Sequence, residues 1–133
     1  MTSATLTARR PATPHQHRLS PPFAVLFLIL VAATVFEVTK HGHLGLALLG
    51  GLGPDLALLA GFAPGLAQGQ LHPRAVPLYN ALHRFAGPVV LLGLASVGVL
   101  GLPWFILGLG WATHIAMDRA AGYRLRGRDG WIR

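Results

Sequence analysis

The chain has 133 residues, of which 53% are hydrophobic and only 11% are charged, and its mean hydropathy is +0.53. Charged residues make up about 25% of a typical soluble domain, so this composition indicates a membrane protein with a single domain. It excludes a disordered chain, which combines low hydrophobicity with high charge. The lack of cysteine excludes a disulfide scaffold and a thiolate metal site.

The formal net charge of +7 comes from eleven basic residues, of which only Lys40 is a lysine, against four acidic residues. The acidic residues are Glu37, Asp55, Asp118 and Asp129. The arginines flank apolar runs and do not form the basic stripe that is typical of nucleic-acid binding. We therefore expect no nucleic acid as a partner.

The first segment, residues 1–20, is basic, contains proline and lacks acids, which is typical of a disordered tail. The apolar run after it resembles the h-region of a signal peptide. Because Glu37 and Lys40 follow this run where small residues would mark a cleavage site, we expect an uncleaved first helix. A start with Ser, Thr and Arg also fits an organelle transit peptide, and this alternative stays open.

The rest of the chain predicts an all-α membrane domain over residues 21–123, followed by a basic C-terminal tail over residues 124–133. Apolar segments of about 17–25 residues are long enough to span a bilayer as helices. Four such segments are predicted, at about residues 21–38, 44–62, 76–100 and 103–121. The second is interrupted by Gly50-Gly51-Leu52-Gly53-Pro54-Asp55, and Pro103 separates the third from the fourth.

The positions of the arginines predict how these four helices are oriented. They group before the first helix, around the loop at residues 63–74 and after the fourth helix, as Arg9, Arg10, Arg18, Arg74, Arg84, Arg119, Arg124, Arg126, Arg128 and Arg133. The opposite loops carry only Lys40. By the positive-inside rule, both termini lie in the cytoplasm and the chain is a multi-pass protein of the inner (plasma) membrane. We expect the C-terminal arginines to contact membrane lipids, and a homo-oligomer stays open.

Helix rise places five polar residues from three helices at one depth. Asp55, Asn80, His83, His114 and Asp118 fall within a slice about 8 Å thick in the cytoplasmic half of the bundle. Asn80 and His83 share one helix face, and His114 and Asp118 share another. An ionisable group in hydrocarbon costs at least about 2.5–3.5 kcal/mol, so we expect these groups to turn inward and pair.

The polar cluster has three interpretations. The candidate binding site consists of Asp55, Tyr79, Asn80, His83, Arg84, His114, Asp118 and Arg119. The first interpretation is a structural network of hydrogen bonds and ion pairs, in which Arg84 or Arg119 neutralises the carboxylates. The alternative is a divalent metal cofactor in a membrane-embedded hydrolase, with the candidate ligands Asp55, His83, His114 and Asp118 and with Asn80 supporting them. The third is a small proton or solute transporter that acts as an oligomer, and whether the chain is an enzyme stays open.

Two stretches carry a family pattern. The first is Tyr79-Asn80-Ala81-Leu82-His83, and the second is His114-Ile115-Ala116-Met117-Asp118-Arg119 followed by Gly122-Tyr123. The segment Gly53-Pro54-Asp55 also fits the pattern. With these motifs the chain resembles an uncharacterised bacterial integral membrane family, domain of unknown function 4260, over residues 21–123. The resemblance implies a small four-helix membrane protein and implies no activity, substrate or cofactor. After Tyr123 the chain departs from the family pattern, with Arg124-Leu125-Arg126 in place of Gly-Leu-Lys.

Overall fold

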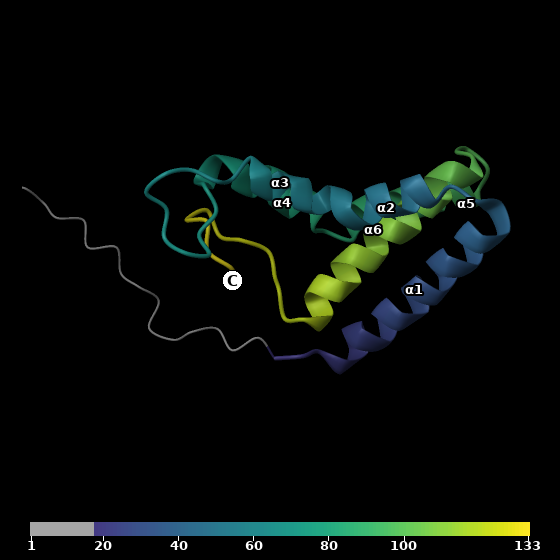
Figure 1. Cartoon of the computed structure of the whole chain (residues 1–133), viewed down its shortest axis with the longest axis horizontal. Helices are drawn as coiled ribbons and strands as arrows, with labels where there is room; N and C mark the ends of the chain where they lie inside the picture. Colours follow the sequence, from purple (N-terminus) through teal and green to yellow (C-terminus); the bar gives the residue numbers. More distant parts are fainter. Residues whose placement is uncertain (1–17) are drawn as a thin grey trace, which may run out of the picture.

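The computed structural model describes residues 18–133, and residues 1–17, which hold most of the predicted basic tail, lie outside the described residues. The regular elements in the described part of the chain are all helical (Figure 1). The single β-type contact within residues 18–133 is an isolated antiparallel bridge between Arg126 and Ile132. The predicted all-α fold class is therefore confirmed.

The helices follow the predicted order, with two of the four predicted segments divided. In chain order they are α1 (Pro21–His41), α2 (Leu44–Leu52), η1 (Gly53–Asp55), α3 (Leu56–Leu59), η2 (Pro73–Ala75), α4 (Val76–Leu82), α5 (Ala86–Ser96) and α6 (Leu102–Ala120). The elements η1 and η2 are short 3-10 helices. The predicted first and fourth helices correspond to α1 and α6, with ends that agree within three residues.

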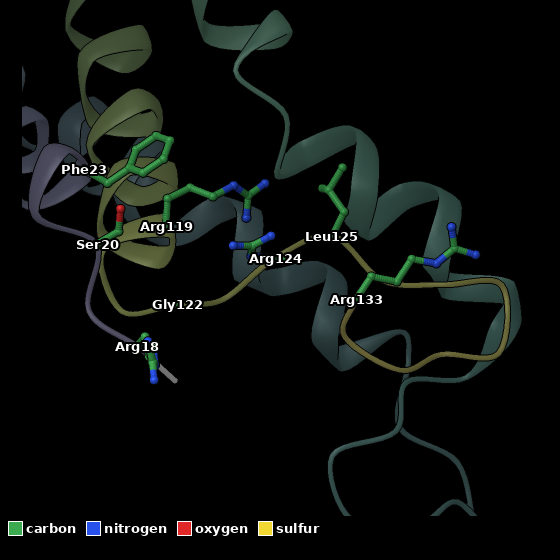
Figure 2. A pocket seen from close by; sticks show the side chains of 8 residues that line it. All are labelled: Arg18, Ser20, Phe23, Arg119, Gly122, Arg124, Leu125 and Arg133. Atoms are coloured by element: carbon green, nitrogen blue, oxygen red, sulfur yellow. The ribbon is translucent and has the colours of Figure 1, made fainter. Parts of the chain in front are cut away.

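Helix α6 is the centre of the molecule. It packs against α1, α2 and α5, and it contains more buried residues than any other described helix. It runs antiparallel to α1, and the backbone N–H of Ser20 donates to the carbonyl oxygen of Ala120 over 2.9 Å. The N-terminal end of α1 therefore lies beside the C-terminal end of α6, as the positions of Ser20 and Gly122 show in Figure 2.

Glycines allow α2 and α6 to approach closely. A Cβ atom on Gly50 would collide with the backbone of Leu107 and Trp111, and one on Gly110 would collide with the backbone of Ala47. Close backbone contact at small residues is typical of helices that pack within a bilayer. This contact sets the position of α2, and with it η1, against α6.

The predicted interruption of the second apolar segment is confirmed. Helix α2 ends at Leu52, the next three residues form η1, and α3 ends at Leu59. Pro54 has no N–H to donate to the carbonyl of Gly50, and its ring would clash with that carbonyl in a continuous α-helix. The break places Asp55 at the junction of η1 and α3.

The predicted continuous helix over residues 76–100 is wrong. The chain forms α4 and α5 with His83, Arg84 and Phe85 between them, and α5 already ends at Ser96. Pro88 explains the break, because in an unbroken helix its ring would clash with the carbonyl of Arg84. His83 therefore leaves the helical conformation, with φ −103° and ψ 16°.

The outer surface of the bundle is strongly apolar. Helix α1 has no buried residue, and side chains such as Leu28 and Ile29 are 65% and 59% exposed. By length and hydropathy, α1 is the one helix within residues 18–133 that qualifies to cross a membrane, whereas the apolar stretch Leu44–Leu59 is shorter. An apolar surface of this extent is typical of contact with lipid or with another protein.

The C-terminal segment after α6 folds back over α4 and the loop before η2. The side chain of Asn80 donates to the backbone carbonyl of Arg126 and accepts from its N–H, over 2.9 and 2.8 Å. The backbone N–H of Leu71 donates to the carbonyl of Gly130 over 3.0 Å. The residues predicted as a tail thus pack against the helical domain.

Candidate metal centre

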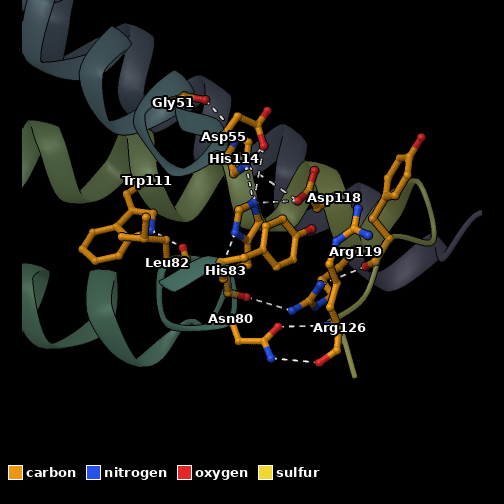
Figure 3. A network of polar contacts seen from close by, with 12 residues as sticks. Gly51, Asp55, Asn80, Leu82, His83, Trp111, His114, Asp118, Arg119 and Arg126 are labelled. Atoms are coloured by element: carbon orange, nitrogen blue, oxygen red, sulfur yellow. Dashed lines mark hydrogen bonds and ion pairs between the residues drawn. The ribbon is translucent and has the colours of Figure 1, made fainter. Parts of the chain in front are cut away.

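Two imidazoles and two carboxylates meet where η1, the end of α4 and the C-terminal half of α6 come together (Figure 3). The Nε2 atoms of His83 and His114 are 3.2 Å apart. The Oδ1 atom of Asp55 lies 3.4 Å from each of these nitrogens. The Oδ2 atom of Asp118 lies 3.5 Å from His83 Nε2 and 3.6 Å from His114 Nε2. The structure therefore brings together the four residues that the sequence singled out as candidate metal ligands.

Backbone carbonyls determine which nitrogen of each imidazole carries the hydrogen. His83 Nδ1 lies 2.8 Å from the carbonyl oxygen of Tyr79, and His114 Nδ1 lies 2.9 Å from that of Gly51. A carbonyl oxygen only accepts, so each Nδ1 must donate. In a neutral imidazole the Nε2 atom then carries a lone pair, and the two lone pairs face the same point.

The Gly51 carbonyl is available because α2 ends there, whereas the Tyr79 carbonyl also accepts from the backbone N–H of His83 over 3.0 Å. The last carbonyls of a helix lack a partner within the helix. Gly51 lies in the last turn of α2 and Tyr79 in the last turn of α4. Trp111 of α6 donates to the carbonyl of Leu82 over 2.7 Å, in the same last turn of α4. The break after α2 thus supplies the acceptor for His114, whereas His83 Nδ1 shares the Tyr79 carbonyl with the backbone N–H of the same histidine.

The histidine side chains are buried and one carboxylate reaches the surface. The side chains of His83 and His114 are 0% and 1% exposed, and that of Asp118 is 14% exposed. The side chain of Asp55 is 49% exposed. The cluster is thus closed on the side of α4 and α6 and accessible beside η1.

Aromatic stacking holds the His83 ring. The ring of Tyr79 stacks on it with centroids 3.9 Å apart and an angle of 17° between the planes. The guanidinium of Arg126 lies 5.0 Å from the centroid of the Tyr79 ring. The C-terminal segment therefore supports the cluster through Tyr79.

No arginine in the described part of the chain forms a direct ion pair with the carboxylates of the cluster. Each ion pair among residues 18–133 has a histidine as its basic partner, and neither Arg84 nor Arg119 pairs with an acid. Arg84 is exposed, and Arg119 donates to the carbonyls of Tyr123 and His83 over 2.9 and 2.8 Å. The expected direct ion pair of Arg84 or Arg119 with Asp55 or Asp118 is therefore absent from the described residues, and Arg119 acts on Asp118 only from a longer distance.

Asn80 lies apart from the cluster because α4 ends before His83. On a continuous helix the two residues would share a face, but the side chain of Asn80 bonds to the backbone of Arg126. The sequence reasoning did not assign Gly51, Trp111 or Arg126 to the site. Pro54, which ends α2, is the sequence feature that could have indicated an open carbonyl acceptor at Gly51. No pattern in the sequence indicated that the C-terminal segment folds back and places Arg126 beside Tyr79.

The donor set fits a divalent metal ion. Metal–ligand bonds of about 2.0–2.2 Å at tetrahedral angles place neighbouring ligand atoms about 3.3–3.6 Å apart. The five measured separations run from 3.2 to 3.6 Å. One ligand atom each from Asp55, His83 and His114 lies within 4.8 Å of the others. An Nδ1–H bonded to a carbonyl is the usual support for a histidine that ligates through Nε2.

Comparison of the sequence with curated proteins and with solved structures gives no match. The family model described as domain of unknown function (DUF4260) matches residues 23–132, which include both helix breaks and the whole His/Asp cluster. The resemblance seen in the sequence motifs is therefore confirmed. The chain belongs to the family of domain of unknown function 4260.

Proposed function

We propose that the chain is a membrane metalloprotein that binds a divalent cation of the zinc class through Asp55, His83 and His114. The observation that carries this proposal is the pair of Nε2 atoms 3.2 Å apart, while both Nδ1 atoms are committed to carbonyl oxygens. Two neutral imidazoles so arranged have facing lone pairs with no proton between them. A cation relieves this repulsion and cancels the charge of the two carboxylates.

Hydrolysis is the chemistry that such a centre would support. A zinc ion with three protein ligands keeps a fourth position for water and lowers the pKa of that water. The half-exposed side chain of Asp55 supports access of water to this position. Asp118 then serves as the fourth ligand, which closes the site, or as the base that accepts the proton of the bound water. Metal retention in Asp118→Asn separates these roles, because loss of the metal indicates a ligand.

The membrane arrangement belongs to the same proposal. We place α1, α2 with α3, α4 with α5, and α6 as four spans, with both termini in the cytoplasm. The exposed apolar side chains, the close glycine contact between α2 and α6 and the position of the arginines support this topology. Broken helices are tolerated within a bilayer where other groups satisfy their carbonyls, as α6 does here.

Metal analysis of the purified protein tests the proposal. The chain is purified without a histidine tag in a His15→Ala/His17→Ala background, because both tail histidines could bind metal on their own and lie outside the described residues. After zinc loading and desalting, we expect about one equivalent of zinc per chain. His83→Ala with His114→Ala should lower this to background, whereas the control His41→Ala, a surface residue of α1, should retain the metal.

A structural network without metal gives a different result. In that case one imidazole is protonated and shares its proton with the carboxylates, and zinc stays at background in all variants. Cobalt substitution adds an independent readout, because tetrahedral Co(II) has strong visible absorption. A zinc content that is equal in the wild type and in the double histidine variant would overturn the proposal.

A further inference from the structure

A second site lies between the N-terminal end of α1 and the C-terminal end of α6. It is an open pocket of about 500 Å³ (Figure 2). Its lining consists of Arg18, Ser20, Phe23, Arg119, Gly122, Arg124, Leu125 and Arg133. None of the four residues of the metal cluster lines it, so the pocket is a separate site.

The four arginines of this pocket have no acidic partner in the part of the chain that the structure describes. Each ion pair there joins an acid to a histidine. Of the four acids, Asp55 and Asp118 belong to the metal cluster, and Glu37 pairs with His41 at the opposite end of α1. Asp129 accepts a hydrogen bond from the backbone N–H of Trp131 and forms no ion pair within residues 18–133. Residues 1–17 contain no acidic residue. The pocket thus gathers four arginines without a direct ion pair to any described residue, and Asp118 attracts Arg119 from outside the pocket.

The surroundings of the pocket increase its positive potential. Arg119 is held in place by its bonds to the carbonyls of Tyr123 and His83, and Arg124 lies close enough to act electrostatically on it. The first turn of α1 carries no acidic residue, and the side chain of Ser20 forms no cap bond. The first two residues of α1 are prolines without an N–H, so α1 contributes only the partial positive charge of its dipole and few backbone donors to an anion.

The shape and chemistry of the pocket fit a phosphate group at a membrane surface. Arginine guanidinium groups bind phosphate with paired hydrogen bonds. Phe23 and Leu125 add apolar sides, and Phe23 stacks on Phe85 with centroids 6.2 Å apart. We propose that this pocket binds a phosphate group, carried on a lipid headgroup or as free phosphate. Arg124 is one of its exposed arginines, and Arg119 is held in place by its two hydrogen bonds.

Ligand-dependent melting of the full chain in neutral detergent tests this proposal. The probes are dioctanoyl phosphatidate, inorganic phosphate and, as an anion without phosphate, octanoate. A ligand that binds the folded state raises the melting temperature in proportion to its affinity. We expect phosphatidate to raise it in the wild type and octanoate to leave it unchanged. The response to inorganic phosphate decides the source, since a similar rise identifies the phosphate alone and no rise identifies the lipid headgroup.

Two arginine variants make the test specific for the pocket. Arg124→Gln removes one charge-assisted contact and should weaken the apparent affinity about tenfold or more. Arg128→Gln is the matched control, because Arg128 is an exposed arginine of the same segment that does not line the pocket. It should change the affinity less than about twofold. No melting response to either phosphate probe, or an equal loss in both variants, would overturn the proposal.

Discussion

The His83 ring is oriented by two different contacts with one residue. Its Nδ1 bonds to the backbone of Tyr79, and its face lies against the Tyr79 ring. The backbone contact survives any substitution at position 79, whereas the stacking depends on an aromatic side chain. Substitution of Tyr79 therefore isolates the contribution of ring orientation to the proposed metal affinity.

We expect Tyr79→Ala to bind zinc about tenfold more weakly, because groups behind a metal ligand typically contribute ten- to hundredfold to affinity. Tyr79→Phe keeps the stacked ring and should bind zinc like the wild type. Competition with a chromophoric chelator measures both affinities. An equal affinity of Tyr79→Ala and the wild type would show that stacking has no part in metal binding.

Asn80 fixes the C-terminal segment by two hydrogen bonds to the backbone of Arg126. Asn80→Ala should therefore release this segment and reduce the free energy of unfolding by about 1–3 kcal/mol, since a hydrogen bond contributes about 0.5–1.5 kcal/mol net. Faster tryptic cleavage after Arg124, Arg126 and Arg128 and faster hydrogen exchange would report the release.

The control for Asn80→Ala is Ser96→Ala, which removes an exposed hydrogen bond to the carbonyl of Leu92 far from this segment. It should leave the tryptic pattern unchanged. If the C-terminal segment of Asn80→Ala exchanges hydrogen as slowly as that of the wild type, the backbone contacts near Leu71 and Gly130 suffice to hold it.

The sequence predicted which residues form the cluster more accurately than it predicted where their side chains point. The depth of Asp55, His83, His114 and Asp118 followed from helix rise, and these four side chains do meet. The direction of Asn80 did not follow, because the spacing rule assumes an unbroken helix. A depth estimate tolerates a local break, whereas the assignment of a helix face does not.

At the level of the element, the helix break at Pro54 was easier to predict from the sequence than the break before Pro88. Pro54 follows a run of glycines, which are poor helix formers, so the interruption was evident from the sequence. Pro88 lies at the start of a long apolar stretch and is tolerated in the first turn of a helix, so the stretch could be read as continuous. A tertiary contact that the sequence does not reveal, the bond from Trp111 to the Leu82 carbonyl, helps to satisfy the end of α4 and stabilises the break.

The packing of α2 on α6 depends on Gly50. Gly50→Ala should reduce the free energy of unfolding by about 1–3 kcal/mol, the usual cost of overpacking, because the new Cβ has only backbone atoms to displace. Equilibrium unfolding in mixed micelles, followed by circular dichroism, measures the change. The displaced α2 would also carry Gly51 away from His114, so zinc retention should fall in parallel.

Gly45→Ala is the matched control for this helix. Gly45 also belongs to α2, but a Cβ there meets no atom within 4 Å. The substitution should be neutral or stabilising by up to about 1 kcal/mol through helix propensity. Equal destabilisation by both substitutions would mean that the glycine contact between α2 and α6 does not hold the two helices together.

At the scale of the whole molecule, the exposed apolar surface of α1 is not covered by the rest of the described chain. Helix α1 is the apolar helix that passes the length criterion for a span, yet none of its residues is buried. A helix with this surface is stable where lipid or a second protein covers it. The other segments are shorter or broken, so the proposal that they also span the membrane rests on their packing around α6 and on the arginine distribution.

Single-cysteine labelling tests the four-span arrangement, and the natural lack of cysteine makes every label specific. Thr39→Cys lies in the last turn of α1 and Val99→Cys in the turn before α6, both assigned to the outer face, and Gln68→Cys lies in the loop assigned to the cytoplasm. All three positions are exposed. With a membrane-impermeant maleimide on intact cells, we expect labelling at positions 39 and 99, and at position 68 only after permeabilisation. If α1 alone crossed the membrane, all three positions would lie on one side. Equal labelling of Gln68→Cys and Thr39→Cys in intact cells would therefore contradict four spans and support a single one.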